Sequence, residues 1–254
     1  MTGPAVLPRS DSPAVPIVST GNPAAAPAAA PAPAPAPARP AAYEHVLHRL
    51  VRREVHLLGE LSTWAAPDDA PRAAALAAHA HLVGRLLLQH HATERDLIWP
   101  ALLRSLPDGP GRARVAEETA RCARLDDLAR GLSTAARQWT VTGTAAARDA
   151  FTLACRALAD AVDDQTATEE HDLLPLLAAL PAAEWTAITA AAPCSLSGRE
   201  RLFVLGLALE DACADERARL LAALPPATRL AWRLAGRRRY RAAVVRLRGA
   251  PPAG

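Results

Sequence analysis

Histidine and glutamate lie four residues apart near the end of a long apolar stretch, at His90 and Glu94. A spacing of four places two side chains one helical turn apart on the same face. Seventy-five residues later, QTATEEHDLLPLL repeats much of HHATERDLIWPAL and places Gln165 and Glu169 at the matching positions. The repeat predicts two similar helix pairs, in which the second helix of each pair faces the other across one core.

Both glutamates interrupt a helix face that is otherwise largely apolar. The inward stripe predicted for the first repeat is His79, Val83, Leu86, His90, Glu94, Leu97 and Ala101. The stripe predicted for the second is Leu158, Ala161, Gln165, Glu169 and Leu176. Burying a carboxylate without a partner is costly, so two such groups need a cation, a buried proton or a hydrogen-bond network. A metal ion fits well, because carboxylate and imidazole at this spacing can reach one centre.

Four long helices are expected to position these side chains. Helical periodicity and breaks at proline or glycine predict helices near 41–66, 71–106, 112–140 and 145–180. Short loops between long helices imply antiparallel neighbours, so the fold class is an all-α, up-down four-helix bundle. Further helices are predicted near 182–191, across 197–223 and near 226–248, with Ser197 and Glu200 forming a capping box.

Composition supports an all-α chain with three parts. Half of the residues are hydrophobic, only 4% are aromatic, and all 29 basic residues are arginine, which with alanine, leucine and glutamate favours helix. The Pro/Ala-rich residues 1–40 are predicted to be a disordered tail. Residues 41–180 form the predicted bundle, and residues 181–254 form a C-terminal helical extension.

The charge and the cysteines limit the partners and the compartment. A net charge of +3 is too small to imply a nucleic-acid partner. The C-terminal arginines are interpreted as a solvated helix face, with phosphate binding as the alternative: Arg237, Arg238, Arg239, Arg241, Arg246 and Arg248. Four widely spaced cysteines indicate free thiols. With no membrane-spanning apolar run and no signal-peptide pattern, we expect a soluble cytoplasmic protein.

The pattern His–x3–Glu, followed six residues after the glutamate by proline, resembles the ligand helix of the hemerythrin-like (HHE cation-binding) family. His90 and Glu94 match one such helix fully, and HRLVRREVHLL looks like the family's first helix with His48 as its ligand. Glu169 matches the carboxylate of the fourth helix. Where the family has histidines on the third and fourth helices, this chain has Cys122 and Gln165, so those two histidines are absent. The resemblance covers roughly residues 41–180, and the C-terminal helices look like an extension found in an actinobacterial branch.

The resemblance implies a non-heme iron centre inside the bundle, in the family a di-iron centre. One metal ion could still be held by His48, His90, Glu94 and Glu169, a set that suits Fe(II), Mn(II) or Zn(II). A dinuclear centre completed by Cys122, Gln165 or water is one alternative. A hydrogen-bonded core without metal is the other, and reversible dioxygen binding by two irons is not expected.

Other polar residues near this pattern receive ordinary interpretations. His91 lies one residue off the stripe and is expected at the surface or rim, and His171 is expected to point outward. Glu118 and Asp126 are expected on a helix surface. His79, three turns before His90, is expected to be a core histidine or to support a ligand.

The function expected from this resemblance is a metal-binding sensor or storage-type protein that responds to dioxygen, nitric oxide, peroxide or iron. The alternative is a metal-free helical scaffold descended from such a protein, which the losses at Cys122 and Gln165 favour. The chain contains no glycine-rich phosphate loop, no GxSxG elbow and no triad pattern, so an enzyme is not expected. The expected partners are a metal ion and a small diatomic ligand, and the oligomeric state stays open.

Overall fold

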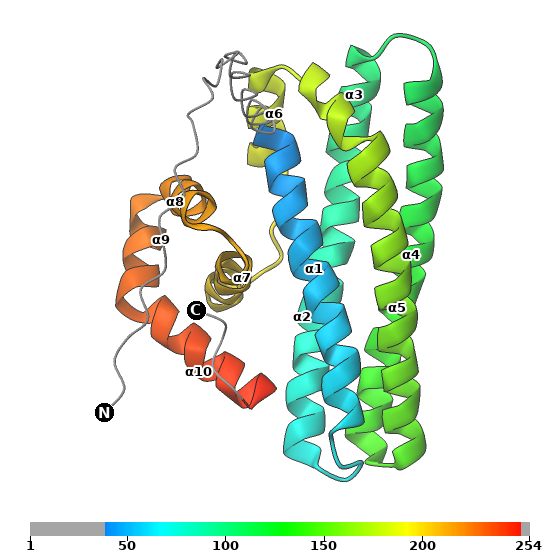
Figure 1. Cartoon of the computed structure of the whole chain (residues 1–254), viewed down its shortest axis with the longest axis vertical. Helices are drawn as coiled ribbons and strands as arrows, with labels where there is room; N and C mark the ends of the chain where they lie inside the picture. The colour runs from blue at the N-terminus through cyan, green and yellow to red at the C-terminus, as the bar shows by residue number, and fades with distance from the viewer. Residues whose placement is uncertain (1–38, 250–254) are drawn as a thin grey trace, which may run out of the picture. The chain divides into compact units, whose positions relative to one another are not determined.

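Four long helices form the bundle in the computed structural model, which describes residues 39–249. They are α1 (Arg39–Thr63), α2 (Ala70–Thr93), α4 (Pro110–Thr142) and α5 (Ala145–Asp172). Each contacts two of the others, and consecutive helices run in opposite directions (Figure 1). The described residues contain no strand, so the all-α, up-down bundle is confirmed. The predicted disordered tail, residues 1–40, lies almost wholly outside the described residues.

Local sequence signals end and begin these helices. The Asp69 side chain accepts a hydrogen bond from the Arg72 amide at the start of α2, and Thr144 caps α5 in the same way. Gly143 ends α4 with a φ of 60°, a left-handed conformation that favours glycine. These caps keep both connections short and place the helices as antiparallel neighbours.

The helix predicted over residues 71–106 is interrupted, because a π-helical turn at Glu94–Ile98 separates α2 from α3 (Trp99–Ser105). Inward residues before and through this turn recur every four positions, at 86, 90, 94, 98 and 102. In a regular α-helix, a residue four positions further along is rotated by about 40° around the helix axis. A π turn has more residues per turn, so it keeps residues at this spacing on the same face. Beyond Glu94 the buried residue is therefore Ile98 rather than Leu97, which differs from the predicted stripe.

A layer of buried polar side chains divides the interior into two apolar clusters. Along α2 and its continuation, the layer falls between Leu87 in one cluster and Ile98 in the other. Along α5 it falls between Val162 and Leu173, which belong to the same two clusters. The second cluster is completed by a 3-10 segment, Leu174–Ala179, which continues α5. The polar layer thus lies within the bundle and not at its end.

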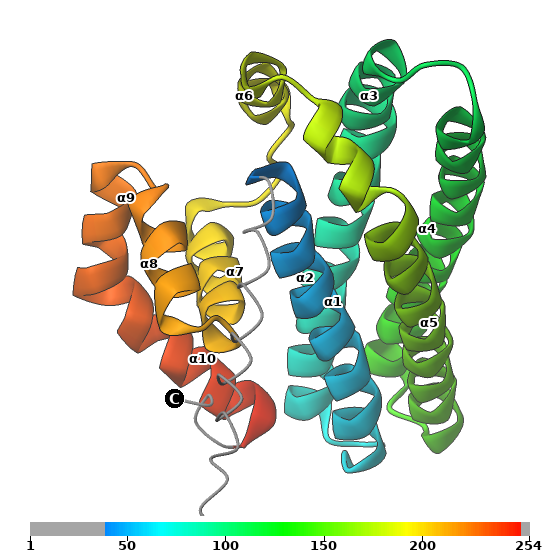
Figure 2. The same ribbon diagram turned by 45° about the horizontal axis from the view of Figure 1, so that its top comes forward.

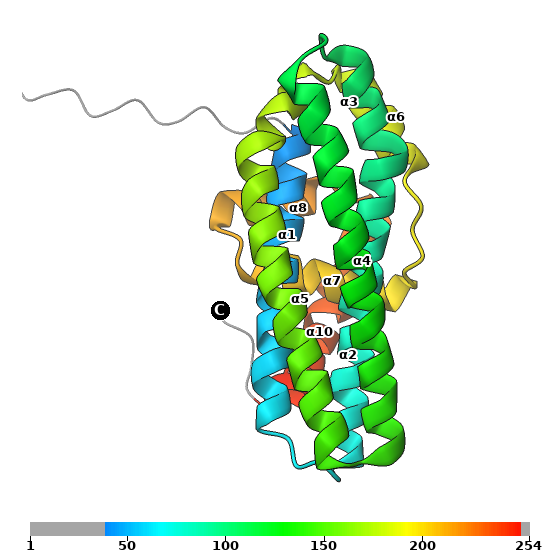
Figure 3. The same cartoon turned by 90° about the vertical axis from the view of Figure 1, so that its right-hand side faces the viewer.

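The remaining helices follow the bundle in sequence. They are α6 (Ala182–Ala191), α7 (Gly198–Glu210), α8 (Ala214–Ala222), α9 (Pro226–Ala231) and α10 (Arg237–Arg248), with a π-helical segment (Trp232–Gly236) before α10. The predicted capping box of Ser197 and Glu200 starts α7. Helices α7 and α10 contact α1 and α2 (Figure 2). Figure 3 shows α4 and α5 on the opposite side of the bundle.

Ion pairs attach the C-terminal helices to the bundle, and close packing joins two of those helices to each other. Gly206 of α7 has no room for a side chain, because a Cβ there would lie 2.3 Å from the ring of Tyr240 in α10. Glu54 of α1 is fully buried and accepts hydrogen bonds from Arg248 at 2.9 Å and Arg53 at 2.7 Å. Arg248 also bonds to Glu210 at 2.6 Å. Arg248 therefore belongs to this network and not to the solvated arginine face that the sequence predicted.

None of the helices in the described part of the chain combines the length and the apolar character that a membrane span requires.

Candidate metal centre

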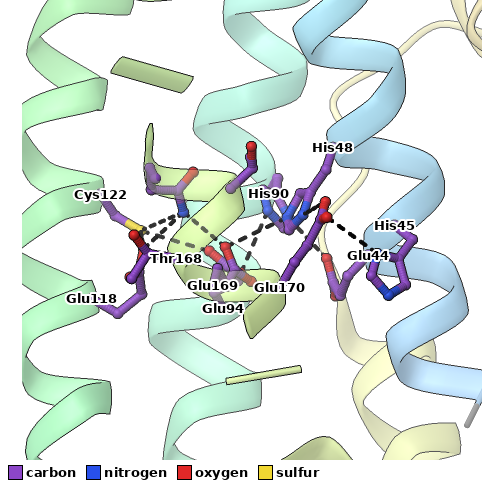
Figure 4. Close-up of polar contacts among 12 residues, drawn as sticks. Glu44, His45, His48, His90, Glu94, Glu118, Cys122, Thr168, Glu169 and Glu170 are labelled. Carbon is purple, nitrogen blue, oxygen red and sulfur yellow. Dashed lines mark hydrogen bonds and ion pairs between the residues drawn. The ribbon is translucent and has the colours of Figure 1, made fainter. Parts of the chain in front are cut away.

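The polar layer gathers buried side chains from all four bundle helices (Figure 4). They are Glu44 and His48 of α1, His90 and His91 of α2, Glu94 of the π turn, Glu118 and Cys122 of α4, and Gln165 and Glu169 of α5. None is more than 6% exposed. Nine buried polar side chains in one layer form a site that apolar packing alone does not explain.

The four residues predicted as principal metal ligands lie together in this layer. His48 Nε2 is 3.5 Å from Glu169 Oε2, and His90 Nε2 is 3.5 Å from Glu94 Oε1. The two imidazole rings lie edge to face with their centres 5.5 Å apart. One ligand atom each from His90, Glu94 and Glu169 falls within 4.8 Å of the others, which is the spacing a single ion needs.

The sequence analysis missed a fifth member of this group, Glu44. Its side chain is 1% exposed, and one of its oxygens forms a second compact set with His48 and His90. The signal was available, since Glu44 precedes His48 by four residues and so shares its helix face. Glu44 adds a carboxylate to the predicted set.

Several ligand-type atoms of this group have no hydrogen-bond partner. Both oxygens of Glu44 are unpartnered, as are the following single atoms: Nε2 of His48 and His90, and Oε1 of Glu94 and Glu169. Buried polar atoms are normally satisfied, because leaving one unpaired costs about 1–3 kcal/mol. Unpartnered atoms in one place therefore indicate a missing partner that all of them share.

The other ring nitrogen of each histidine faces a carboxylate. His48 Nδ1 is 3.1 Å from Glu170 Oε1, and His90 Nδ1 is 3.4 Å from Glu44 Oε2. The hydrogen bond between His48 and Glu170 fixes that ring and its tautomer, with the proton on Nδ1 and the lone pair on Nε2. Metal-bound histidines in proteins are usually held in this way.

Cys122 and Gln165 occupy the places where the resemblance expects histidines, and both bond to the carboxylates of the layer. Gln165 Nε2 donates to Glu118 Oε1 and to Glu169 Oε2, both at 2.8 Å. Cys122 Sγ lies 3.8 Å from Glu94 Oε2 and 3.7 Å from Glu118 Oε1. This half of the layer is partly satisfied by its own hydrogen bonds.

Residues 41–177 match the family model described as the hemerythrin HHE cation-binding domain. The chain belongs to this family. No curated protein and no solved structure matches it in the same comparisons. The family is one of cation-binding domains, and the residues of this HHE domain fit such a group, because its unpartnered nitrogen and oxygen atoms converge in a buried layer.

Three expectations about neighbouring residues of the HHE domain were wrong. His91 is fully buried, Glu118 is fully buried and Asp126 is 7% exposed, although a surface or rim position was expected for each. The reason is that α2 packs against both α1 and α4, and α4 packs against both α2 and α5, so the inward face of each helix is wider than a single stripe. His90 faces Glu44 of α1, and His91 faces Asp126 of α4.

Two other histidines lie outside the candidate metal centre of the HHE domain. His79 is buried, and its Nε2 is 2.7 Å from Glu54 Oε2, so it belongs to the network that holds the C-terminal helices. His171 is exposed, as expected.

Burial and like charges act together on the ionisable groups of the HHE domain. Burial raises the pKa of Glu44 well above its usual value, and the charge of Glu169 raises it further. Burial also raises the pKa of Glu94, with added repulsion from Glu169 and Glu44. The pKa of His90 is lowered by burial and by the neighbouring His48 and His91. Without a positive ion, burial therefore favours the neutral forms of Glu44, Glu94 and His90.

Proposed function

We propose that this HHE-domain protein binds one divalent cation through His48, His90, Glu94 and Glu169, with Glu44 as an additional carboxylate. The observation that carries the proposal is the convergence of unpartnered imidazole and carboxylate atoms in a buried layer. Two imidazole nitrogens with several carboxylate oxygens suit non-heme iron first, and manganese or zinc as alternatives.

The chain's own groups prepare this position. Glu170 accepts a hydrogen bond from Nδ1 of His48 and so orients the Nε2 lone pair of that ring. The apolar clusters on both sides exclude water. A bound non-heme iron would supply redox chemistry and a coordination position open to a small ligand.

We further propose that the role is binding and sensing rather than catalysis, with dioxygen, nitric oxide, peroxide or iron itself as the signal. Support comes from the closed, buried position of the site and from the C-terminal helices, which pack on the two helices that carry His48 and His90. A change at either histidine would be transmitted to that surface. The four free cysteines are consistent with the reducing cytoplasm that we propose as its location.

Metal analysis of the full chain tests the proposal. The protein is freed of metal, reconstituted under reducing conditions with Fe(II), Mn(II) or Zn(II), desalted and measured for metal per chain. We expect tight binding, and affinity lower by roughly 100-fold or more in His90→Ala, since even the outer partners of ligands are worth about 10- to 100-fold. His171→Ala, at an exposed histidine of α5, is the matched control and should bind as the parent does.

The second candidate function is a metal-free helical scaffold. Gln165 favours it, because its amide donates a hydrogen bond to one oxygen of Glu118 and to one oxygen of Glu169 without an ion. The same experiment separates the two functions. Failure of every metal to bind, together with a gain in stability on replacing His90 and Glu94 by leucine, would support the scaffold and exclude the cation site.

A further inference from the structure

A pocket of about 500 Å³ lies where the C-terminal helices meet the bundle. Its walls come from α2, α7, the π-helical segment before α10, and α10 itself, which contacts both α2 and α7 (Figure 2). No residue of the candidate metal centre lines it. Small-molecule sites in proteins typically measure about 300–1,000 Å³, so the pocket has the size of a ligand site.

The pocket has an apolar and largely aromatic wall. The rings of Phe203 and Tyr240 lie with their centres 5.5 Å apart, and His79 meets Phe203 edge to face at 5.9 Å, which holds that ring in place. Phe203 is only partly buried, so some of its apolar surface faces the pocket. A ligand that covered this surface would bind through the hydrophobic effect. The apolar wall consists of Leu82, Leu202, Phe203, Tyr240 and Ala243.

Three arginines border the same pocket. Arg199 comes from α7, and Arg239 and Arg246 come from α10. All three are exposed, and within residues 39–249 none of their guanidinium groups forms a hydrogen bond or an ion pair. The arginines therefore surround an apolar wall with positive charge that remains available to a ligand.

Glu200, an acidic residue in the pocket wall, does not neutralise these arginines. One of its oxygens accepts a hydrogen bond from Arg85, and the other accepts one at 2.8 Å from the Ser197 amide of the capping box. Its charge is thus paired outside the group of three arginines.

We propose that this pocket binds a small amphipathic organic anion, a carboxylate or phosphate carried on an alkyl or aryl body. The body would cover the apolar wall, and the anionic group would accept hydrogen bonds from the arginines. Guanidinium groups suit this role, because their paired N–H donors match the oxygens of a carboxylate or phosphate. The inference goes beyond the proposed function and does not depend on it.

Calorimetric titration of the full chain with three probes tests the pocket. Decanoate has both an apolar body and a charge, decanol lacks the charge, and acetate lacks the body. We expect decanoate to bind at one site per chain. Decanol and acetate should each bind roughly tenfold or more weaker, because each loses one of the two contributions.

Replacing two of the bordering arginines tests the role of charge. Arg239→Ala combined with Arg246→Ala should weaken decanoate binding roughly tenfold or more and leave decanol binding unchanged, since hydrogen bonds to charged groups are the stronger ones. Arg237→Ala combined with Arg238→Ala is the matched control. It removes the same charge from exposed positions of the same helix that do not line the pocket, and it should bind decanoate as the parent does.

Filling the pocket tests the role of the apolar wall. Ala243→Trp places an indole ring in the pocket from α10 and should abolish decanoate binding, while circular dichroism shows that the helices are retained.

Several results would overturn the inference. They are absence of decanoate binding in the parent, equal affinity for decanoate and decanol, and equal losses in the two arginine pairs. Arginine-dependent binding to vesicles of anionic phospholipid, without decanoate binding, would assign the arginines to a lipid surface and overturn the pocket as well. Metal content enters none of these measurements, so the proposed cation site stands or falls separately.

Discussion

Glu44 carries a carboxyl group that the metal-free interior leaves without a hydrogen bond. Both of its oxygens are unpartnered, and the side chain is 1% exposed. We expect Glu44→Leu to raise the free energy of unfolding of the metal-free protein by about 1–3 kcal/mol, because it removes an unsatisfied polar group. The same change should weaken cation binding. Urea unfolding with and without a chelator measures the first effect, and metal competition measures the second.

Glu60 of the same helix provides the control, since it is exposed. Glu60→Leu should change the free energy of unfolding by less than about 0.5 kcal/mol and leave cation binding intact. A loss of stability in metal-free Glu44→Leu would mean that the carboxyl group already has a partner.

The sequence predicts part of the site at the level of single residues. Repeated spacing identifies His90, Glu94 and Glu169, and the resemblance of the first helix identifies His48. His91 was not predicted, because a stripe one residue wide assumes that a helix has a single packed side. Its burial depends on which helix lies next to α2, and that is a property of the tertiary structure.

Helix boundaries follow closely from proline, glycine and capping residues, as at Asp69 and Gly143. The π turn at Glu94–Ile98 does not follow from proline, glycine or capping residues. The signal that could have found it is the run of buried residues at a spacing of four, since a regular α-helix cannot keep that spacing on one face. Tertiary packing on both sides of the polar layer imposes the extra residue.

Deleting Asp96, an exposed residue in the middle of the π turn, tests the role of this turn. We expect a regular α-helix, because the deletion removes the extra residue that the π turn accommodates. Ile98 then comes seven residues after His90, which is two turns along the same face, so the apolar cluster and the candidate metal centre should both keep their contacts. Thermal unfolding and metal content of the deletion variant measure the two.

Asp96→Ala serves as the control for the deletion, because it alters the same exposed position without changing the length of the helix. It should keep both the metal content and the unfolding temperature close to those of the parent. A deletion variant that loses metal, or that unfolds at a clearly lower temperature than Asp96→Ala, would show that the extra residue of the turn is itself needed.

The network around Glu54 makes the attachment of the C-terminal helices depend on pH. Burial alone raises the pKa of Glu54, but the hydrogen bond from His79 and the charges of Arg53 and Arg248 outweigh it and lower the pKa from 4.5 to about 2. A lowered pKa stabilises the folded chain fully above pH 4.5. The contribution, about 3 kcal/mol, is lost as the pH falls from 4.5 towards 2.

Glu54→Gln should therefore destabilise the protein near neutral pH and reduce the loss of stability between pH 4.5 and 2. Denaturant unfolding of both proteins across this range gives the difference that belongs to Glu54. The exposed Glu60→Gln on the same helix controls for the general effect of removing a charge from α1. Parallel pH profiles for the parent and Glu54→Gln would contradict the assignment.

At the scale of the whole molecule, the sequence predicts the all-α class and the existence of the C-terminal helices. It does not predict where those helices pack. Their place against α1 and α2 depends on contacts such as the ion pair between Glu54 and Arg248, which are 194 residues apart. Such a contact leaves no local pattern in the chain.

The position of the polar layer also has a consequence for folding. Apolar burial stabilises each half of the interior separately, because the polar layer lies between the two apolar clusters. In the metal-free protein, we therefore expect the half that contains α3, the 3-10 segment and α6 to open more readily than the other half. A bound ion would join the halves into one cooperative unit and tie the rigidity of that end of the bundle to metal supply.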